Sequence, residues 1–104
     1  MPHDPKILER LRDATAALTR LERGEEPSPE ELKAAPKLDW WYLTEHHGAL
    51  ALGGVVTGHP TLPEGAHIYT SCLLWVAEDQ RAARTLSRFY RLGTPLDDVL
   101  ATKN

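Results

Sequence analysis

The spacing of the apolar residues changes at Pro36 and divides the chain into two parts. Before Pro36, apolar residues recur every three or four positions, which is typical of amphipathic helices. After it, apolar and aromatic residues alternate or run together, which is typical of strands. Helices followed by a run of strands predict an α+β fold.

The first part predicts two helices. The apolar stripe of the first consists of Ile7, Leu11, Ala14, Leu18 and Leu21. Asp4 is suited to cap its start and Gly24 to end it, so we expect a helix over about 5–23. Ser28-Pro29-Glu30-Glu31 is a capping box. Pro36 limits the second helix to about 29–35.

The second part predicts a small antiparallel sheet of about four strands, packed on the two helices. We expect these strands over 38–44, 49–57, 66–76 and 83–92. Gly53-Gly54 indicates a bulge, a bend or the close approach of another backbone. A bend there would curl the sheet toward a barrel. Gly58-His59-Pro60 predicts a fixed turn in which His59 hydrogen-bonds the loop backbone.

The segment 79–92 has an alternative interpretation. At the helical period its four arginines, Arg81, Arg84, Arg88 and Arg91, fall on one face, so local periodicity favours an amphipathic helix. On a strand, Arg84 and Arg88 share one face and Arg91 leaves by the other. Three strands followed by this helix are therefore the alternative fold. After Gly93 we expect an irregular or short helical piece.

Length and composition limit the range of functions. The chain has 104 residues, which predicts one domain over 1–104. A net charge of −3 argues against a general polyanion binder, although residues 80–92 hold four arginines and no acid. Cys72 is the only cysteine, which suits a reducing compartment. With no signal-peptide core and no apolar run of ~20 residues, we expect a cytoplasmic protein without membrane contact.

The histidines and the cysteine do not predict a metal centre or a catalytic site. The residues considered are His46, His47, His59, His67 and Cys72. Neutral imidazole and thiolate bind zinc, but neither C-x-x-C nor H-x-x-x-H spacing occurs. Cys72 lies between apolar neighbours, where an inert thiol is usual. We expect no cofactor, and a small metal-dependent enzyme is the weakest hypothesis.

Two features favour binding. The arginines, interleaved with Phe89 and Tyr90, suit contacts with phosphates and bases or with a protein. Alternatively, they pair with the acids of the first half of the chain, Glu25, Glu26, Glu30, Glu31 and Asp39. Trp41 points away from Trp40 and Tyr42 on a strand. One side is expected to be core, and the other would expose an aromatic unless a partner, a second copy or the first helix covers it.

Three tracts resemble a known family. They are A-A-P-K-L-D-W-W, G-H-P-T-L-P-E-G-A-H-I-Y-T-S and R-T-L-S-R-F-Y-R-L-G. Over roughly residues 28–95 they are similar to short, uncharacterised bacterial proteins, a domain of unknown function. The resemblance implies no catalytic residue or cofactor. It implies a β-hairpin with its acidic turn at Glu78-Asp79, so a strand over 83–92 is preferred to the helix.

These observations predict a non-catalytic binding module. We expect a protein partner in preference to nucleic acid, and a small regulator or inhibitor, such as one carried by a mobile element. The residues expected to bind are Arg81, Arg84, Arg88, Arg91, Tyr90 and Trp41. A nucleic-acid-binding regulator that uses the arginine–aromatic face is the alternative, and a homo-oligomer is a further option.

Overall fold

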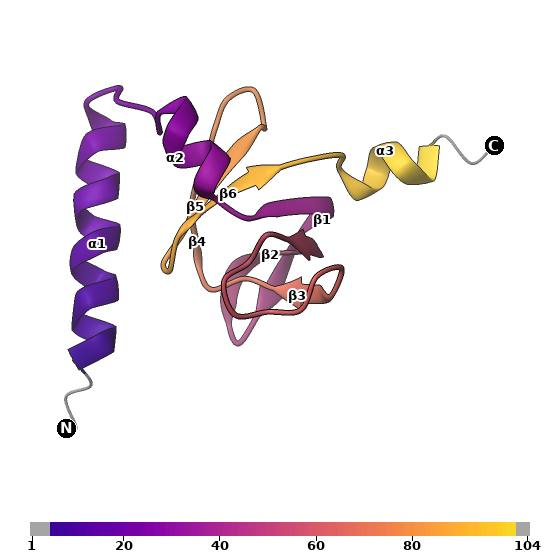
Figure 1. Cartoon of the computed structure of the whole chain (residues 1–104), viewed down its shortest axis with the longest axis horizontal. Helices are drawn as coiled ribbons and strands as arrows, with labels where there is room; N and C mark the ends of the chain where they lie inside the picture. The colour runs from indigo at the N-terminus through magenta and orange to yellow at the C-terminus, as the bar shows by residue number, and fades with distance from the viewer. Residues whose placement is uncertain (1–4, 102–104) are drawn as a thin grey trace.

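The computed structural model describes residues 5–101 and shows helices at both ends of a mixed sheet (Figure 1). In this part of the chain the helices are α1 (Pro5–Glu22), α2 (Pro29–Ala34) and α3 (Leu96–Ala101). The strands are β1 (Lys37–His46), β2 (Ala49–Thr57), β3 (His67–Tyr69), β4 (Leu73–Val76), β5 (Ala82–Thr85) and β6 (Phe89–Leu92). The α+β class is confirmed, and no helix of the described residues is long and apolar enough to cross a membrane.

The strand count of four is wrong, because two of the expected strands each break in the middle. The segment 66–76 breaks at Thr70, whose backbone N–H donates to Leu52 O (2.8 Å) while its hydroxyl accepts from Leu52 N (3.0 Å). The segment 83–92 breaks after Thr85, whose hydroxyl accepts from the backbone N–H groups of Ser87 and Arg88 (both 3.3 Å). A threonine hydroxyl stabilises a turn in this way. The alternative helix over 79–92 is also wrong, because β5 and β6 occupy that segment.

The sheet has the order β3-β2-β1-β6-β5-β4 and is mixed rather than antiparallel. The exception is the central pair β1 and β6, which run parallel, with Leu38 opposite Leu92. The two edge strands β3 and β4 are joined by residues 70–72 only, so the sheet curls. It does not close, because no pairing joins β3 to β4 in the described residues.

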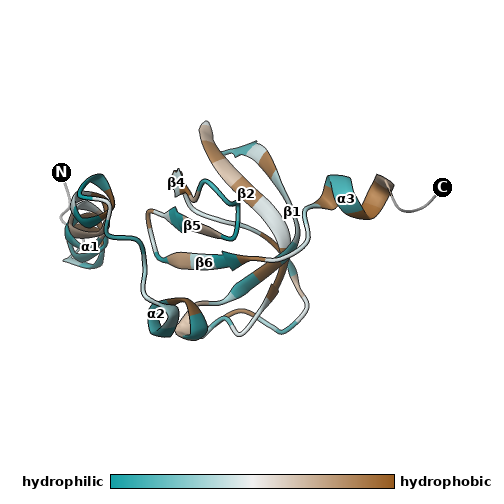
Figure 2. Cartoon of the chain, turned by 90° about the horizontal axis from the view of Figure 1, so that it is seen from above, coloured by the Kyte–Doolittle hydropathy of each residue, from teal (hydrophilic) through white to brown (hydrophobic). Residues whose placement is uncertain are grey.

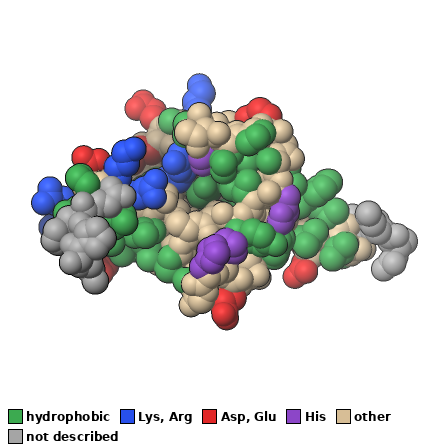
Figure 3. Space-filling view, turned by 90° about the horizontal axis from the view of Figure 1, so that it is seen from below, with side chains coloured by type: hydrophobic (Ala, Val, Ile, Leu, Met, Phe, Trp, Pro, Cys, Tyr) green, Lys and Arg blue, Asp and Glu red, His purple; other side chains and the backbone are tan. Residues whose placement is uncertain are grey.

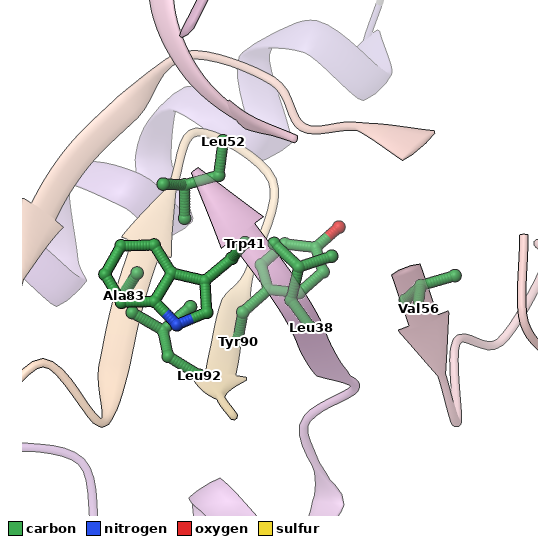
Figure 4. Packing of buried hydrophobic residues seen from close by; sticks show 7 residues of the cluster. All are labelled: Leu38, Trp41, Leu52, Val56, Ala83, Tyr90 and Leu92. Carbon is green, nitrogen blue, oxygen red and sulfur yellow. The ribbon is translucent and has the colours of Figure 1, made fainter. Parts of the chain in front are cut away.

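The core lies on the inner face of this curled sheet (Figure 4). Its buried side chains are Leu38, Trp41, Leu52, Val56, Ala83, Tyr90 and Leu92. They come from β1, β2, β5 and β6, so the core depends on the parallel pairing at the centre of the sheet. Trp41 contributes the largest ring, and its Nε1 donates to Gly93 O (3.0 Å).

A bulge in β1 decides which tryptophan is buried. Trp40 and Trp41 together face Gly54 of β2, and Trp40 has a positive φ of 55°. Trp40 is 52% exposed and Trp41 only 8% exposed. The exposed surface expected at Trp41 is therefore not found. Of the three alternatives expected for the glycine pair, the close approach of another backbone is found, since a Cβ on Gly54 would lie 2.9 Å from the Asp39 carbonyl oxygen.

The helices contact the sheet less than expected. α2 begins with the predicted capping box of Ser28 and Glu31. On α1 the buried residues are Ala14 and Ala17. Ile7 and Leu11, the first residues of the predicted stripe, are exposed. Figures 1 and 2 show α1 and α3 at opposite ends of the molecule. The cap expected at Asp4 lies outside the described residues.

Candidate functional site

The arginines predicted to bind a partner do not form one row. In the β5–β6 hairpin, Arg84 pairs with Phe89 and Arg91 with Ala82, so Arg84 and Arg91 share the outer face. Arg88 lies in the turn between the strands. The expectation that Arg84 and Arg88 share a strand face, with Arg91 opposite, is wrong because of that turn.

Arg84 is buried although it carries a charge. The residue is 7% exposed, its Nε donates to Thr85 O (2.9 Å), and its guanidinium lies 5.0 Å from the centre of the Phe89 ring. Its Nη2 has no hydrogen-bond partner among the described residues. Burial lowers the pKa of Arg84, Asp13 opposes this effect, and the charge of Arg88 adds to it.

The other predicted binding residues lie in different environments. Arg88 is half-buried, and its Nε is buried without a partner in the described part of the chain. Arg91 is half-buried and donates from Nε to Ala35 O (3.2 Å). Arg81 is exposed. Tyr90 is 4% exposed and belongs to the core, where burial raises the pKa of its hydroxyl.

The acids of the first half do not pair with these arginines. Glu31 pairs instead with Arg20 of α1 (2.9 Å), and this hydrogen-bonded contact lowers the pKa of Glu31 to about 2. Asp39 lies 3.7 Å from Lys37. Within residues 5–101, none of the four arginines of the 80–92 segment forms an ion pair.

Arg84 and Arg88 border a pocket of about 430 Å³ between the helices and the β5–β6 turn. Its lining consists of Asp13, Glu31, Ala34, Ala35, Pro36, Arg84, Ser87, Arg88 and Phe89. Both arginines therefore meet at one site without a paired carboxylate. We call this site the arginine pocket.

A second site was not predicted from the sequence. Five aromatic side chains form a surface cluster, the tyrosine–histidine cluster, which consists of Tyr42, His46, His47, His67 and Tyr69. The Tyr42 hydroxyl lies 2.7 Å from His67 Nε2. The His46 ring stacks on Tyr69 with centroids 4.6 Å apart, and Tyr69 meets His67 edge to face at 5.1 Å.

The glycine of β2 makes room for this cluster. Gly53 pairs with Tyr42 on one side and with Tyr69 on the other, so both rings lie on its face of the sheet. A Cβ at Gly53 would collide with the Tyr42 ring. Desolvation and the neighbouring Tyr69 raise the pKa of the Tyr42 hydroxyl. The sequence offered one signal for this cluster: Tyr42 and His46 lie four positions apart, which puts both side chains on the same face of a strand.

Figure 3 shows how the two kinds of group are distributed. Lys and Arg side chains gather toward the α1 end, whereas the histidines lie over the sheet among hydrophobic groups.

Residues 3–103 match a family described as a family of unknown function (DUF6634). The chain belongs to this family. Comparison with curated proteins and with solved structures found no match.

Membership of DUF6634 confirms the resemblance, and the matched residues include both the arginine pocket and the tyrosine–histidine cluster.

In this member of the family, the described residues contain no group of three or more His, Cys, Asp or Glu side chains placed to hold a metal ion. His59 accepts from the N–H groups of Thr61 and Leu62 (both 3.1 Å), as expected for a fixed turn. The Cys72 thiol is half-buried.

Proposed function

We propose that this chain is a non-catalytic binding module and that its partner is a protein, which docks on the tyrosine–histidine cluster. The observation that supports this proposal is a set of aromatic rings already ordered at the surface. Tyr69 is 48% exposed, yet it is held between His46 and His67. Within the cluster, ring contacts join the tyrosines and histidines to one another.

Ordered tyrosines are well suited to protein recognition. A tyrosine offers a large contact area and loses little conformational freedom on binding, because only two side-chain torsions must be fixed. Here the stacking contacts and the Tyr42–His67 hydrogen bond restrict these torsions before any partner arrives. Such preorganisation increases affinity by lowering the entropy lost in the complex.

The charge of the surrounding surface favours a protein over a nucleic acid. From residue 38 to residue 80, which includes β2, β3 and β4, the sequence has no lysine or arginine. Binding to a nucleic acid relies on cations that neutralise phosphates. The cluster, with two tyrosines of which Tyr69 is 48% exposed, instead gives the aromatic composition of a protein interface.

The arginines give little support to the nucleic-acid alternative. Of the four that were expected to contact phosphates, Arg84 is buried and Arg88 and Arg91 are half-buried. Arg81 is the exposed one. One exposed arginine does not make the charged groove that tracks a nucleic-acid backbone.

Site-specific crosslinking tests the proposal. A photo-crosslinking phenylalanine derivative replaces Tyr69 in cells that make the protein, and the same derivative replaces exposed Glu78 as a control. We expect a protein to be captured from position 69 and not from position 78. Capture of nucleic acid at position 69, or of the same proteins at both positions, would contradict the proposal.

Reconstitution with the captured protein gives the second measurement. Tyr69→Ala should lower the affinity of the chain for the captured protein by about thirtyfold, the effect of an interface hot spot. The melting temperature of the chain should change little, because the Tyr69 side chain is exposed. Gln80→Ala, on the exposed β4–β5 turn, is the control. A steep fall of this affinity with added salt would show that charges rather than aromatic rings hold the pair together, and would contradict the proposed site.

A further inference from the structure

Two side chains that line the arginine pocket each carry a buried donor without a partner in the described residues. Arg84 Nη2 and Arg88 Nε are both inaccessible to solvent, and neither has a hydrogen-bond partner among the described residues. A buried guanidinium donor left without an acceptor costs more than a neutral one, because the group has lost its hydration. Buried donors in folded proteins almost always have a partner.

The two arginines also lack a counter-charge. Their charges act unfavourably on each other, since Arg88 lowers the pKa of Arg84. Asp13 lines the pocket and acts on Arg84 electrostatically, but it forms no ion pair with Arg84 in the described structure. Glu31, the other acid of the lining, is engaged by Arg20. Two arginines therefore line one pocket, and in the described residues no carboxylate is paired with either.

We propose that Arg84 and Arg88 together bind one oxyanion, a phosphate or carboxylate group of a small molecule, in the arginine pocket. The guanidinium group presents several N–H donors in one plane and is suited to oxygen anions of this kind. Phe89 stacks on Arg84 and restrains its guanidinium before an anion arrives. The pocket volume of about 430 Å³ is in the range of small-molecule sites.

The apolar part of the lining indicates an organic anion. The apolar wall consists of Ala34 at the end of α2, Ala35 and Pro36, and Phe89 adds an aromatic ring to the lining. Such a wall suits the carbon skeleton of a ligand, while the arginines hold its charged group. This proposal goes beyond the protein-binding function, and no residue that lines the pocket belongs to the tyrosine–histidine cluster.

The test is an NMR titration of the full chain that follows the Nε–H signals of Arg84 and Arg88. Potassium phosphate and potassium acetate are the two probes, each titrated at constant ionic strength set with potassium chloride. We expect a saturable shift of the Arg88 signal. Stronger binding of phosphate identifies a phosphate group, and equal or stronger binding of acetate identifies a carboxylate.

Three variants separate this site from a general charge effect. Arg88→Gln should weaken binding by about tenfold, since it removes a charged donor. Arg81→Gln removes the same charge from an exposed position outside the pocket lining and should leave binding unchanged. Asp13→Asn should tighten binding about two- to fivefold, since it removes a competing carboxylate near Arg84.

Asp13→Asn is expected to bind the anion more tightly, a result that misfolding cannot produce. The proposal can therefore be tested even if the Arg88→Gln protein does not fold. The proposal is overturned by shifts that never saturate, by chloride giving the same shifts as both probes, or by Arg81→Gln weakening binding as much as Arg88→Gln. A rise in melting temperature with the stronger probe gives an independent readout, because a ligand that binds only the folded state stabilises it.

Discussion

At the scale of the residue, one backbone angle determines which of the two adjacent tryptophans, Trp40 or Trp41, is buried. Strict alternation would give the two rings opposite faces of a regular strand, and either could be the buried one. The positive φ of Trp40 creates the bulge that turns Trp41 inward onto Gly93 O. A positive φ is unfavourable for a bulky residue, so the packing of Trp41 must offset the strain at Trp40.

Substitutions at these two positions should therefore affect the free energy of unfolding differently. Trp41→Ala should lower the free energy of unfolding by about 3–5 kcal/mol, because it empties a large part of the core. Trp40→Gly should be at least as stable as Trp40→Ala, since glycine adopts a positive φ without steric cost. Urea denaturation measures both comparisons. A Trp41→Ala protein as stable as the wild type would contradict the assigned core.

The adjacent glycines of β2 offer a matched pair. A Cβ on Gly54 would lie 2.8 Å from Leu38 Cγ and 2.9 Å from the backbone oxygen of Asp39, neither of which can move freely. The atoms nearest to a Cβ on Gly53 would be those at the outer end of the Tyr42 side chain. Gly54→Ala should thus cost about 1–3 kcal/mol by overpacking, and Gly53→Ala less.

Gly53→Ala should instead disturb the tyrosine–histidine cluster. Displacing the Tyr42 ring breaks its contact with His67 Nε2, so the ring signals of His67 should shift in NMR spectra while the melting temperature changes less than in Gly54→Ala. Equal destabilisation by the two substitutions would show that the Tyr42 ring is fixed by more than the contacts described.

At the scale of the element, α2 is a helix of six residues whose start is specified by side chains. Ser28 accepts from the Glu31 backbone N–H (3.1 Å), and the Glu31 carboxylate accepts from the Ser28 N–H (3.2 Å). The same carboxylate binds Arg20, which ties α1 to α2. One acid therefore stabilises both a helix start and the contact between two helices.

Removing the cap should be measurable. Ser28→Ala should lower the free energy of unfolding by about 1 kcal/mol, and Ser28→Asp, which keeps an acceptor at the cap, should retain most of it. Thermal denaturation monitored by circular dichroism compares the three proteins. If Ser28→Asp were as destabilised as Ser28→Ala, the hydroxyl would matter for a reason other than capping.

The lowered pKa of Glu31 gives a dependence on pH. The pKa is about 2 in the folded protein against an ordinary value of 4.5, so the stabilisation by Glu31 is fully present above about pH 4.5 and is lost as the pH falls toward 2. The difference in stability between the wild type and Glu31→Gln should shrink over that interval. It should also be smaller at high salt, since the paired side chains are 43% and 37% exposed.

Features that depend on neighbouring residues could be predicted from the sequence, whereas those that depend on distant ones could not. The start of α2 follows from four consecutive residues, Ser28 to Glu31. The break at Thr70 depends on Leu52, eighteen positions away, so no local pattern marks it. For the same reason, the sequence singled out the arginines as a group but did not predict that Arg84 is buried or that Arg84 and Arg88 line one pocket.

At the scale of the whole molecule, the chain is extended. Its radius of gyration is 14.2 Å, compared with about 13 Å for a compact domain of this length. α1 and α3 project from opposite ends of the sheet and account for the difference (Figures 1 and 2). Ile7, Leu8 and Leu11 remain exposed on α1. The stability of the sheet should therefore depend little on the first turns of α1.

Hydrogen exchange tests this division. Amides of Leu52 and Val56 in the core should exchange slowest, whereas those in the first half of α1 should exchange much faster, because a helix with few tertiary contacts opens locally. Native-state exchange followed by NMR gives the order directly. Equal protection in the first turns of α1 and in β2 would mean that α1 is covered in solution.

The parallel pairing of β1 with β6 also determines when this protein can acquire its structure. β1 begins at Lys37, while its partner strand ends at Leu92. A ribosome must therefore synthesise the chain from β1 through Leu92 before the two central strands can meet, and the apolar side of β1 and β2 stays uncovered in the meantime. The core of this protein should thus form only after β6 has been translated.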